Sequence, residues 1–366
     1  MSPVRDVAGT CLHVLMQNEA QVLAETRATW ASVLCFLLGL GAGAVVLRGA
    51  ARPLSGDGSV GIPVALIAGG IAAAAFVVST FMHRRGETTV MPRWQALISD
   101  LSAVALTIAF AGVTGLGVLL GAEVLSVGVQ GLELPMIGGA ALAGVASAVG
   151  GRFAFIAGVG LQTDDLAALL YSYLVIGTLF AMLTAADPNW WRLNFSQLGN
   201  GQDAWAFNGT VIVAGLLVAT VGAYIGRDLH RLRGDASIGR IAWVVVLWAA
   251  TGIALASVGL FPLSQVPVLH NIASLATLVL FAVVAFLTTL SMPGPPRSLL
   301  ITTVGVIVMI VVAVLLADPL HVYSITVLEV IVVGLGLLWL TTLVRALGMF
   351  VPDVTRPSAR PQLLSA

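Results

Sequence analysis

Long apolar runs, separated by short polar segments, make up most of the 366-residue sequence. A helix that crosses a bilayer needs about 20 predominantly apolar residues. Ten runs approach this length, at residues 30–46, 60–82, 101–121, 135–150, 166–186, 208–226, 241–260, 269–290, 299–317 and 323–343. The runs lack the alternation of barrel strands, and lipid requires every backbone group to be paired. The pattern therefore predicts an all-α, polytopic membrane bundle of ten transmembrane helices.

Composition supports the same class. The chain is 58% hydrophobic and 9% charged, with a mean hydropathy of +1.02. This is too few charges to cover the surface of a water-soluble protein of this size. Lipid must therefore solvate the chain. The fourth run is ambiguous because Arg152 follows it. Either this span ends at Gly150 or it continues through Phe153 to Gly160.

The arginines predict an orientation. All 17 basic residues are arginine, and basic residues accumulate in cytoplasmic loops. If both termini are cytoplasmic, only Arg48, Arg52 and Arg192 lie outside, and the other 14 arginines lie inside. The use of arginine without lysine, together with abundant Ala, Gly and Val, is typical of high-GC bacterial genomes. We therefore expect a multi-pass protein of the bacterial inner (plasma) membrane.

The two ends of the chain are the least apolar parts. Residues 1–29 have no compact apolar core before a small-residue cleavage site, which is unlike a secretory signal peptide. Two interpretations remain open: a frayed cytoplasmic tail, or an amphipathic interfacial helix. The apolar side of such a helix would carry Leu12, Leu15, Met16 and Leu23. Residues 348–366 are expected to form a disordered cytoplasmic tail.

Residues 187–209, DPNWWRLNFSQLGNGQDAWAFNG, form a polar and aromatic loop between two apolar runs. In the predicted orientation the loop lies outside. Trp190, Trp191 and Trp205 suit the headgroup region of the bilayer, so they are predicted interface anchors. Anchoring does not explain the many amide and hydroxyl groups of the same loop. These groups indicate either a binding site or the capping of helix ends.

Short stretches in and after this loop carry a family resemblance. They are FSQLG at 195–199, FNG at 207–209 and VGLFPLSQVPVLHN at 258–271. In these stretches the chain resembles the bacterial membrane proteins of domain of unknown function 998, which are similar to the Frag1/DRAM/Sfk1 group. The resemblance covers residues 166–347. It implies a six-span family-like module at 161–347 after an added four-span module at 30–160, and it implies links to membrane lipids and signalling.

The polar residues at the predicted outer helix ends define a candidate pocket for a lipid or envelope-precursor headgroup. Arg192 would hold an anionic group through its planar fork, and His270 or His321 would accept or donate a proton. The full candidate set for ligand binding is Arg192, Asn194, Ser196, Gln197, Asn208, His270, Asn271, His321 and Glu329.

Three functions remain open from the sequence. The first is a binding protein for lipid headgroups or a partner of envelope machinery. The second is a secondary transporter that uses Glu329, a carboxylate within the last span, as its proton or ion site. The third is a membrane enzyme that modifies a lipid, although the chain has no recognised catalytic spacing. We expect no cofactor, metal or nucleic-acid partner. Membrane lipids and other envelope membrane proteins are the expected partners.

Two further local features give expectations about packing. Asp100, and the pair Asp164–Asp165, are predicted to lie at helix N-termini, where they complement the helix dipole. The glycine pairs at 39/43 and 117/121 have the spacing of closely packed membrane helices.

Overall fold

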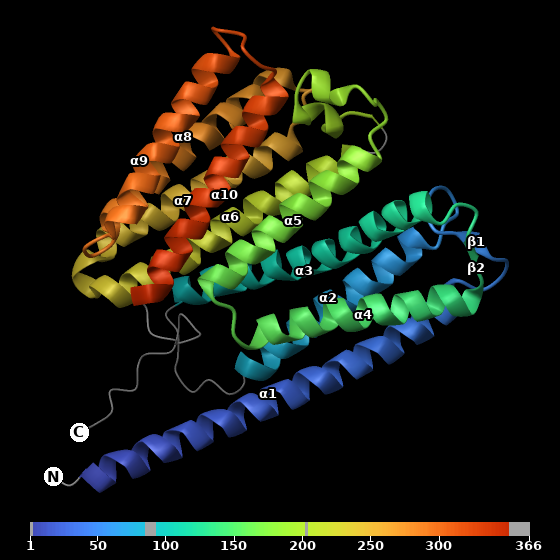
Figure 1. Ribbon diagram of the computed structural model, residues 1–366, viewed down its shortest axis with the longest axis horizontal. Helices are drawn as coiled ribbons and strands as arrows, with labels where there is room; N and C mark the ends of the chain where they lie inside the picture. Colours follow the sequence, from blue (N-terminus) through green and yellow to red (C-terminus); the bar gives the residue numbers. More distant parts are fainter. Residues whose placement is uncertain (1–2, 85–92, 202–203, 351–366) are drawn as a thin grey trace. The chain divides into compact units, whose positions relative to one another are not determined.

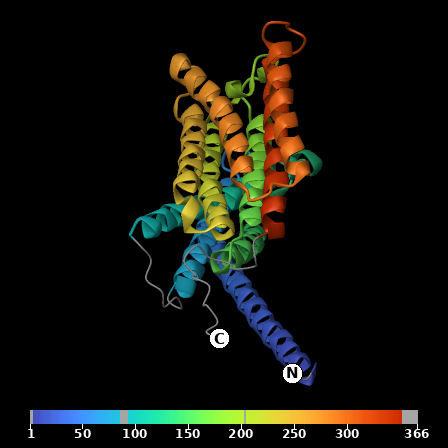
Figure 2. The same cartoon turned by 90° about the vertical axis from the view of Figure 1, so that its left-hand side faces the viewer.

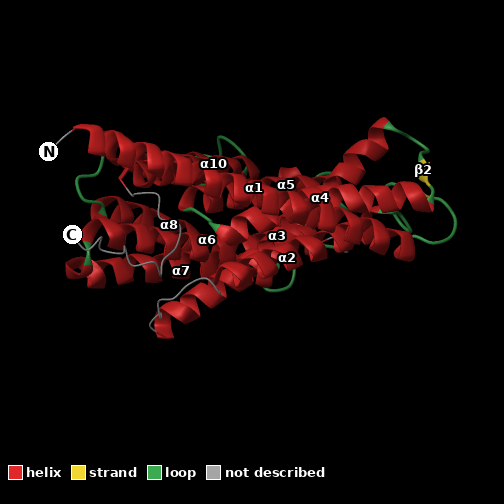
Figure 3. Ribbon diagram, turned by 90° about the horizontal axis from the view of Figure 1, so that it is seen from below, coloured by secondary structure: helices red, strands yellow, loops and turns green. Residues whose placement is uncertain are grey.

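A computed structural model describes residues 3–84, 93–201 and 204–350. Nearly all of them are helical (Figures 1 and 3). The helices are α1 (Pro3–Val46), α2 (Gly61–Arg84), α3 (Arg93–Gly128), α4 (Met136–Val159), α5 (Thr163–Leu183), α6 (Ala204–Arg233), α7 (Ile238–Leu260), α8 (Pro267–Ser291), α9 (Arg297–Ala317) and α10 (Ile325–Phe350). In the described part of the chain, all ten are long and apolar enough to span a membrane. The predicted all-α bundle is confirmed, and the chain is a multi-pass membrane protein.

The ambiguous fourth span takes the longer of its two predicted forms. Helix α4 continues past Arg152 to Val159. The Arg152 guanidinium pairs with the Glu25 carboxylate of α1 at 2.6 Å and lies 3.4 Å from the Thr29 hydroxyl. A charge near the end of an apolar helix is tolerated when a neighbouring helix supplies its counter-ion.

Helix α1 continues without a break from Pro3 into the first span, over 44 residues. The side chains before Val22, including Leu12, Leu15 and Met16 of the predicted amphipathic face, lie outside the described set. At the other end α10 extends to Phe350. The remainder of the predicted tail lies outside the described residues.

The chain divides into two compact units. The first contains α1, α2, α4 and the end of α3 from Val124 onward. It also contains a two-stranded antiparallel ladder in which β1 (Arg52–Pro53) pairs with β2 (Glu133–Leu134). The second unit contains α3 as far as Glu123 and everything from Gly160 onward.

Small residues determine the packing of the first unit. A Cβ on Gly39 would lie 2.6 Å from the Ala143 carbonyl oxygen, and one on Gly43 would lie 2.8 Å from the Ala140 Cα. This confirms the close packing predicted for the 39/43 pair, because only glycine lets α1 approach α4 so closely. The same prediction is wrong for Gly117 and Gly121, where an added Cβ would meet no described atom within 4 Å.

Two buried tryptophans form the centre of the second unit. The rings of Trp248 on α7 and Trp339 on α10 stack with their centroids 6.1 Å apart, and Phe281 on α8 meets Trp339 edge-on at 5.4 Å. Each indole N–H donates to a buried threonine hydroxyl, Trp248 to Thr288 at 3.1 Å and Trp339 to Thr303 at 2.9 Å. Buried indoles need such partners, so these threonines fix how α7–α10 pack.

The predicted helix starts are partly correct. Asp164 and Asp165 lie in the first turn of α5, and the Asp165 carboxylate accepts the Gln162 backbone N–H at 3.0 Å. Asp100 was placed wrongly, because α3 begins at Arg93 and Asp100 therefore lies about two turns inside it. The mixed polar and apolar residues 93–100 continue the helix ahead of its apolar run.

The polar loop between α5 and α6 lies at one end of the second unit (Figure 1). The same end contains the first turns of α8 and α10, which hydrogen bonds join to this loop. Figure 2 shows the loop among the upper ends of the helices of this unit.

Candidate functional site

We call residues Thr184–Gly201 the cap. The cap contains two short 3-10 helices, η1 (Trp190–Arg192) and η2 (Phe195–Gly199). Its entry is fixed by Asp187, whose carboxylate accepts the Asn189 backbone N–H at 2.8 Å. Aspartate side chains stabilise turns in this way, and the Pro188 that follows disfavours continuation of α5.

A histidine joins the cap to α8. His270 Nδ1 lies 2.9 Å from the Phe261 carbonyl oxygen and 3.1 Å from that of Val258. Carbonyl oxygens only accept, so Nδ1 carries the proton, and in the neutral ring Nε2 accepts from the Ser196 hydroxyl at 2.8 Å. A serine and a histidine at this distance also match a nucleophile and its base. However, the two residues are 7% and 4% exposed and neither lines a described cavity. We therefore interpret the Ser196–His270 hydrogen bond as a contact that holds the cap against α8, and we call it the latch.

Two side chains of α10 hold the other part of the cap. The Thr326 hydroxyl donates to the Trp191 carbonyl oxygen at 2.7 Å, and Glu329 Oε2 accepts the Phe195 backbone N–H at 2.6 Å. Residues three apart on a helix share a face, so Thr326 and Glu329 meet the cap together. The intramembrane carboxylate predicted to be an ion site thus contacts the cap backbone.

Asn208, in the first turns of α6, contacts the end of η2. Its Nδ2 donates to the Gly199 carbonyl oxygen at 3.1 Å. A Cβ on Gly199 would lie 2.4 Å from Asn208 Oδ1. The glycine of FSQLG and the asparagine of FNG therefore fit against one another, which gives these two motifs a shared structural reason.

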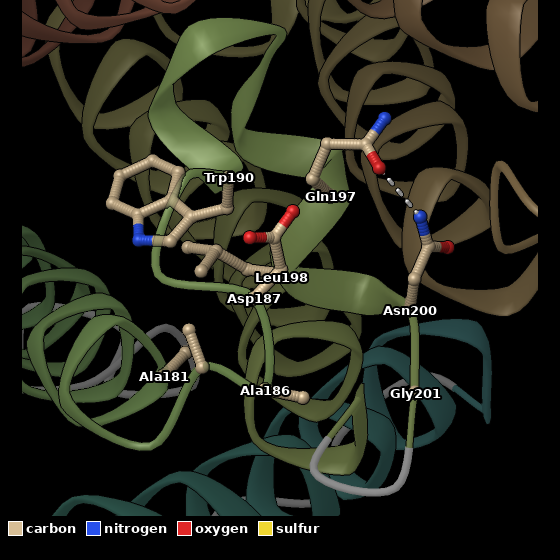
Figure 4. A pocket seen from close by; sticks show the side chains of 9 residues that line it. Ala181, Ala186, Asp187, Trp190, Gln197, Leu198, Asn200 and Gly201 are labelled. Carbon is tan, nitrogen blue, oxygen red and sulfur yellow. Dashed lines mark hydrogen bonds between the residues drawn. The ribbon is translucent and has the colours of Figure 1, made fainter.

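A cavity of about 290 Å³ opens between the cap and the end of α5 (Figure 4). Its described lining residues are Ala181, Ala185, Ala186, Asp187, Trp190, Gln197, Leu198, Asn200 and Gly201. In Figure 4 the Asp187 carboxylate is seen between the Trp190 ring and the amide pair of Gln197 and Asn200. These two amides are joined by a 3.0 Å bond from Asn200 Nδ2 to Gln197 Oε1.

The structure brings together only part of the predicted ligand set. Ser196, Asn208, His270 and Glu329 meet in the contacts that hold the cap, and Gln197 alone of the set lines the cavity. Asn194 is half-buried, and its Oδ1 has no hydrogen-bond partner among the described residues.

The other predicted members lie apart from the cavity. Arg192 is exposed, with its guanidinium 5.5 Å from the ring centroid of Trp191. Asn271 and His321 are exposed, and His321 has a positive φ of 50°. Their roles in ligand binding stay predictions.

The three loop tryptophans differ in their surroundings. Trp191 and Trp205 are 53% and 54% exposed, which suits the predicted interface anchors. Trp190 is half-buried, lines the cavity and packs against Phe195 with the ring centroids 5.1 Å apart.

Sequence reasoning missed Asp187 and Asn200 as cavity residues. Asp187 was one of many polar residues at helix ends, and Asn200 was one of many amides in the loop. A local signal exists for both residues, because Asp187–Pro188 and Asn200–Gly201 are pairs that favour turns. The backbone of a turn fixes the direction of the side chains that it carries.

A second buried polar cluster joins α5 to α6 at the end remote from the cap. Asp228 Oδ1 accepts from Arg227 Nε at 2.9 Å, and its Oδ2 accepts from the Thr163 hydroxyl at 2.5 Å. Arg231 lies 3.7 Å from the same carboxylate, and the Arg227 guanidinium lies over the Tyr224 ring. Both oxygens of the buried carboxylate are occupied, so the cluster is a helix-to-helix contact. Among the described residues, no group of three His, Cys, Asp or Glu side chains could hold a metal ion.

The cap and the helices around it coincide with a family match. Residues 166–346 match the sequence profile of the family described as "Protein of unknown function (DUF998)". This part of the chain belongs to the DUF998 family. The match confirms the family resemblance and begins within α5 and ends within α10, so the DUF998 region contains the cap, its latch and the cavity. No curated protein and no solved structure matches the chain.

Proposed function

We propose that this DUF998 protein binds the polar headgroup of a membrane lipid, or of a lipid-linked envelope precursor, in the cavity beneath its cap. The observation that carries the proposal is the position of that cavity. It lies where spanning helices end, which is the depth of lipid headgroups, and charged, amide and aromatic side chains line it.

The fixed geometry of the cap supports binding. Ser196, Phe195 and Gly199 each make a hydrogen bond to a different helix, so three helices hold the cap in place. A binding site held in its bound shape loses less entropy when the ligand arrives. The arrangement favours ligand binding over catalysis, because the buried Ser196 and His270 side chains hydrogen-bond to one another and hold the cap.

The transport hypothesis has less support from this geometry. Glu329 does not line the described cavity, and its carboxylate accepts a backbone hydrogen bond from the cap. A headgroup-binding role uses the cavity directly and requires no second pathway through the bundle.

A cavity-filling variant tests the proposal. Ala186 is exposed and lines the cavity, so Ala186→Trp should occlude it. Ala50, an exposed residue in a loop of the other unit, provides the matched control Ala50→Trp. Mass spectrometry of lipid that copurifies with the full chain should detect a defined lipid in the wild type and Ala50→Trp, and roughly tenfold less in Ala186→Trp. Equal amounts of the same lipids in all three proteins would contradict the proposal.

A further inference from the structure

The charged group among the described lining residues of the cap cavity is an acceptor, the carboxylate of Asp187. Asp187 uses its Oδ1 to accept the Asn189 N–H, and a carboxylate has about four acceptor sites on its two oxygens. Asn200 donates its amide hydrogen to Gln197, and its Oδ1 is buried with no partner among the described residues. That oxygen points away from Asp187 and Trp190 (Figure 4), so the acceptor that the cavity offers to a ligand is the Asp187 carboxylate, whose charge favours a cation.

The charge of the residues that line the cavity also favours a cationic ligand. Asp187 is negative, and no arginine is among the described lining residues. The nearest arginine in sequence, Arg192, is exposed and lies against Trp191. Asp187 therefore gives the lining a negative charge, which attracts a cation and repels a phosphate.

The indole ring of Trp190 forms another part of the cavity lining. Its contact with Phe195 restricts the orientation of the ring. The face of an indole ring attracts ammonium groups through its quadrupole, and a nearby carboxylate adds to this attraction. Trp190 and Asp187 are three residues apart in one turn, so the cap itself presents both groups.

We infer that the cap cavity recognises a cationic ammonium group of headgroup size, primary or quaternary, held between Trp190 and Asp187. The inference rests on the proposed function and names its ligand class. A volume of about 290 Å³ lies at the lower end of small-molecule cavities, so the cavity suits a headgroup and leaves the acyl chains in the bilayer. The same chemistry would hold a free amine.

The experiment uses the full chain in detergent, incubated with an equimolar mixture of phosphatidylethanolamine, phosphatidylcholine and phosphatidylglycerol. Retained lipid is measured by native mass spectrometry. We expect at least one of the two ammonium lipids to be retained roughly tenfold over phosphatidylglycerol. Asp187→Asn should abolish most of this preference. Asp318→Asn, which removes an exposed carboxylate from the α9–α10 connection, should leave it unchanged.

The outcomes separate this inference from the proposed function. Phosphatidylglycerol retained as well as the ammonium lipids, but lost in Ala186→Trp, would overturn the amine inference and keep headgroup binding. Lipid retention that Ala186→Trp does not change would overturn headgroup binding.

A second arm measures ethanolamine and tetramethylammonium binding by calorimetry. Saturable binding that Asp187→Asn removes, without selective lipid retention, would support amine recognition and identify a soluble ligand. No binding in either arm would overturn both proposals.

Discussion

Gly199 shows how a single position in the cap is constrained. Its missing side chain leaves room for Asn208, whose amide donates to the Gly199 carbonyl oxygen. Gly209, the next residue after Asn208, has no described atom within 4 Å of where a Cβ would lie. Gly199 of FSQLG and Gly209 of FNG lie close together in sequence, but only Gly209 leaves room for a side chain.

This difference gives a residue-scale prediction. Gly199→Ala should displace Asn208 and destabilise the protein by on the order of 1–3 kcal/mol, since it introduces a clash and breaks a hydrogen bond. Gly209→Ala should be neutral or slightly stabilising, because alanine favours a helix. Thermal unfolding of the two purified variants in the same detergent measures the difference. Equal midpoints would mean that the Gly199–Asn208 contact does not hold the cap.

Individual contacts of the cap were beyond prediction from the sequence. Ser196 and His270 are 74 positions apart, and the helix ends that meet in a bundle are not encoded by the apolar pattern of each helix alone. Arg192 was assigned to the pocket because its planar guanidinium at an outer helix end suits an anionic headgroup. A 3-10 helix turns its side chains about 120° at each step, so Trp190 lines the cavity while Arg192 is exposed.

At the scale of elements, α10 and the cap depend on one another through Thr326 and Glu329. The Glu329 carboxylate is the acceptor for a backbone N–H of the cap. A hydrogen bond of this kind contributes about 0.5–1.5 kcal/mol net, so this bond helps to keep η2 against α10.

Amide hydrogen exchange tests this dependence. In Glu329→Ala the peptide that contains Phe195 should exchange roughly tenfold faster or more, because its N–H loses the acceptor. Glu329→Gln retains an acceptor oxygen and should stay close to the wild type. Unchanged exchange in Glu329→Ala would show that other contacts suffice. Faster exchange in the Gln variant as well would show that the negative charge is required.

The number of spanning helices could be predicted from the sequence, but their ends could not. Lipid forces about 20 apolar residues into each span, so ten runs gave ten helices. Helix α6 extends from Ala204 to Arg233, well past the apolar run at 208–226. Its last turns contain Asp228 and four basic side chains, which the hydrocarbon would exclude but which a helix in water accommodates.

For the whole molecule, the arginine asymmetry predicts that both termini are cytoplasmic and the cap is outside. Single cysteines at two exposed sites test this orientation in a chain whose Cys11 and Cys35 are replaced by alanine. Gly201→Cys in the cap should react with a membrane-impermeant maleimide added to intact cells. Ala236→Cys, between α6 and α7, should react only after permeabilisation. The reverse pattern would invert the topology and place the cap cavity in the cytoplasm.

The stacked indoles of Trp248 and Trp339 have an optical consequence. Their planes are only 22° apart and their centroids are 6.1 Å apart, close enough for the electronic transitions of the two rings to couple. Such coupling, in rings held rigidly by the hydroxyls of Thr288 and Thr303, produces circular dichroism in the near ultraviolet. Since the two rings belong to α7 and α10, the intensity of that band follows the separation of these helices. The near-ultraviolet circular dichroism of the DUF998 region should therefore report how closely α7 and α10 pack.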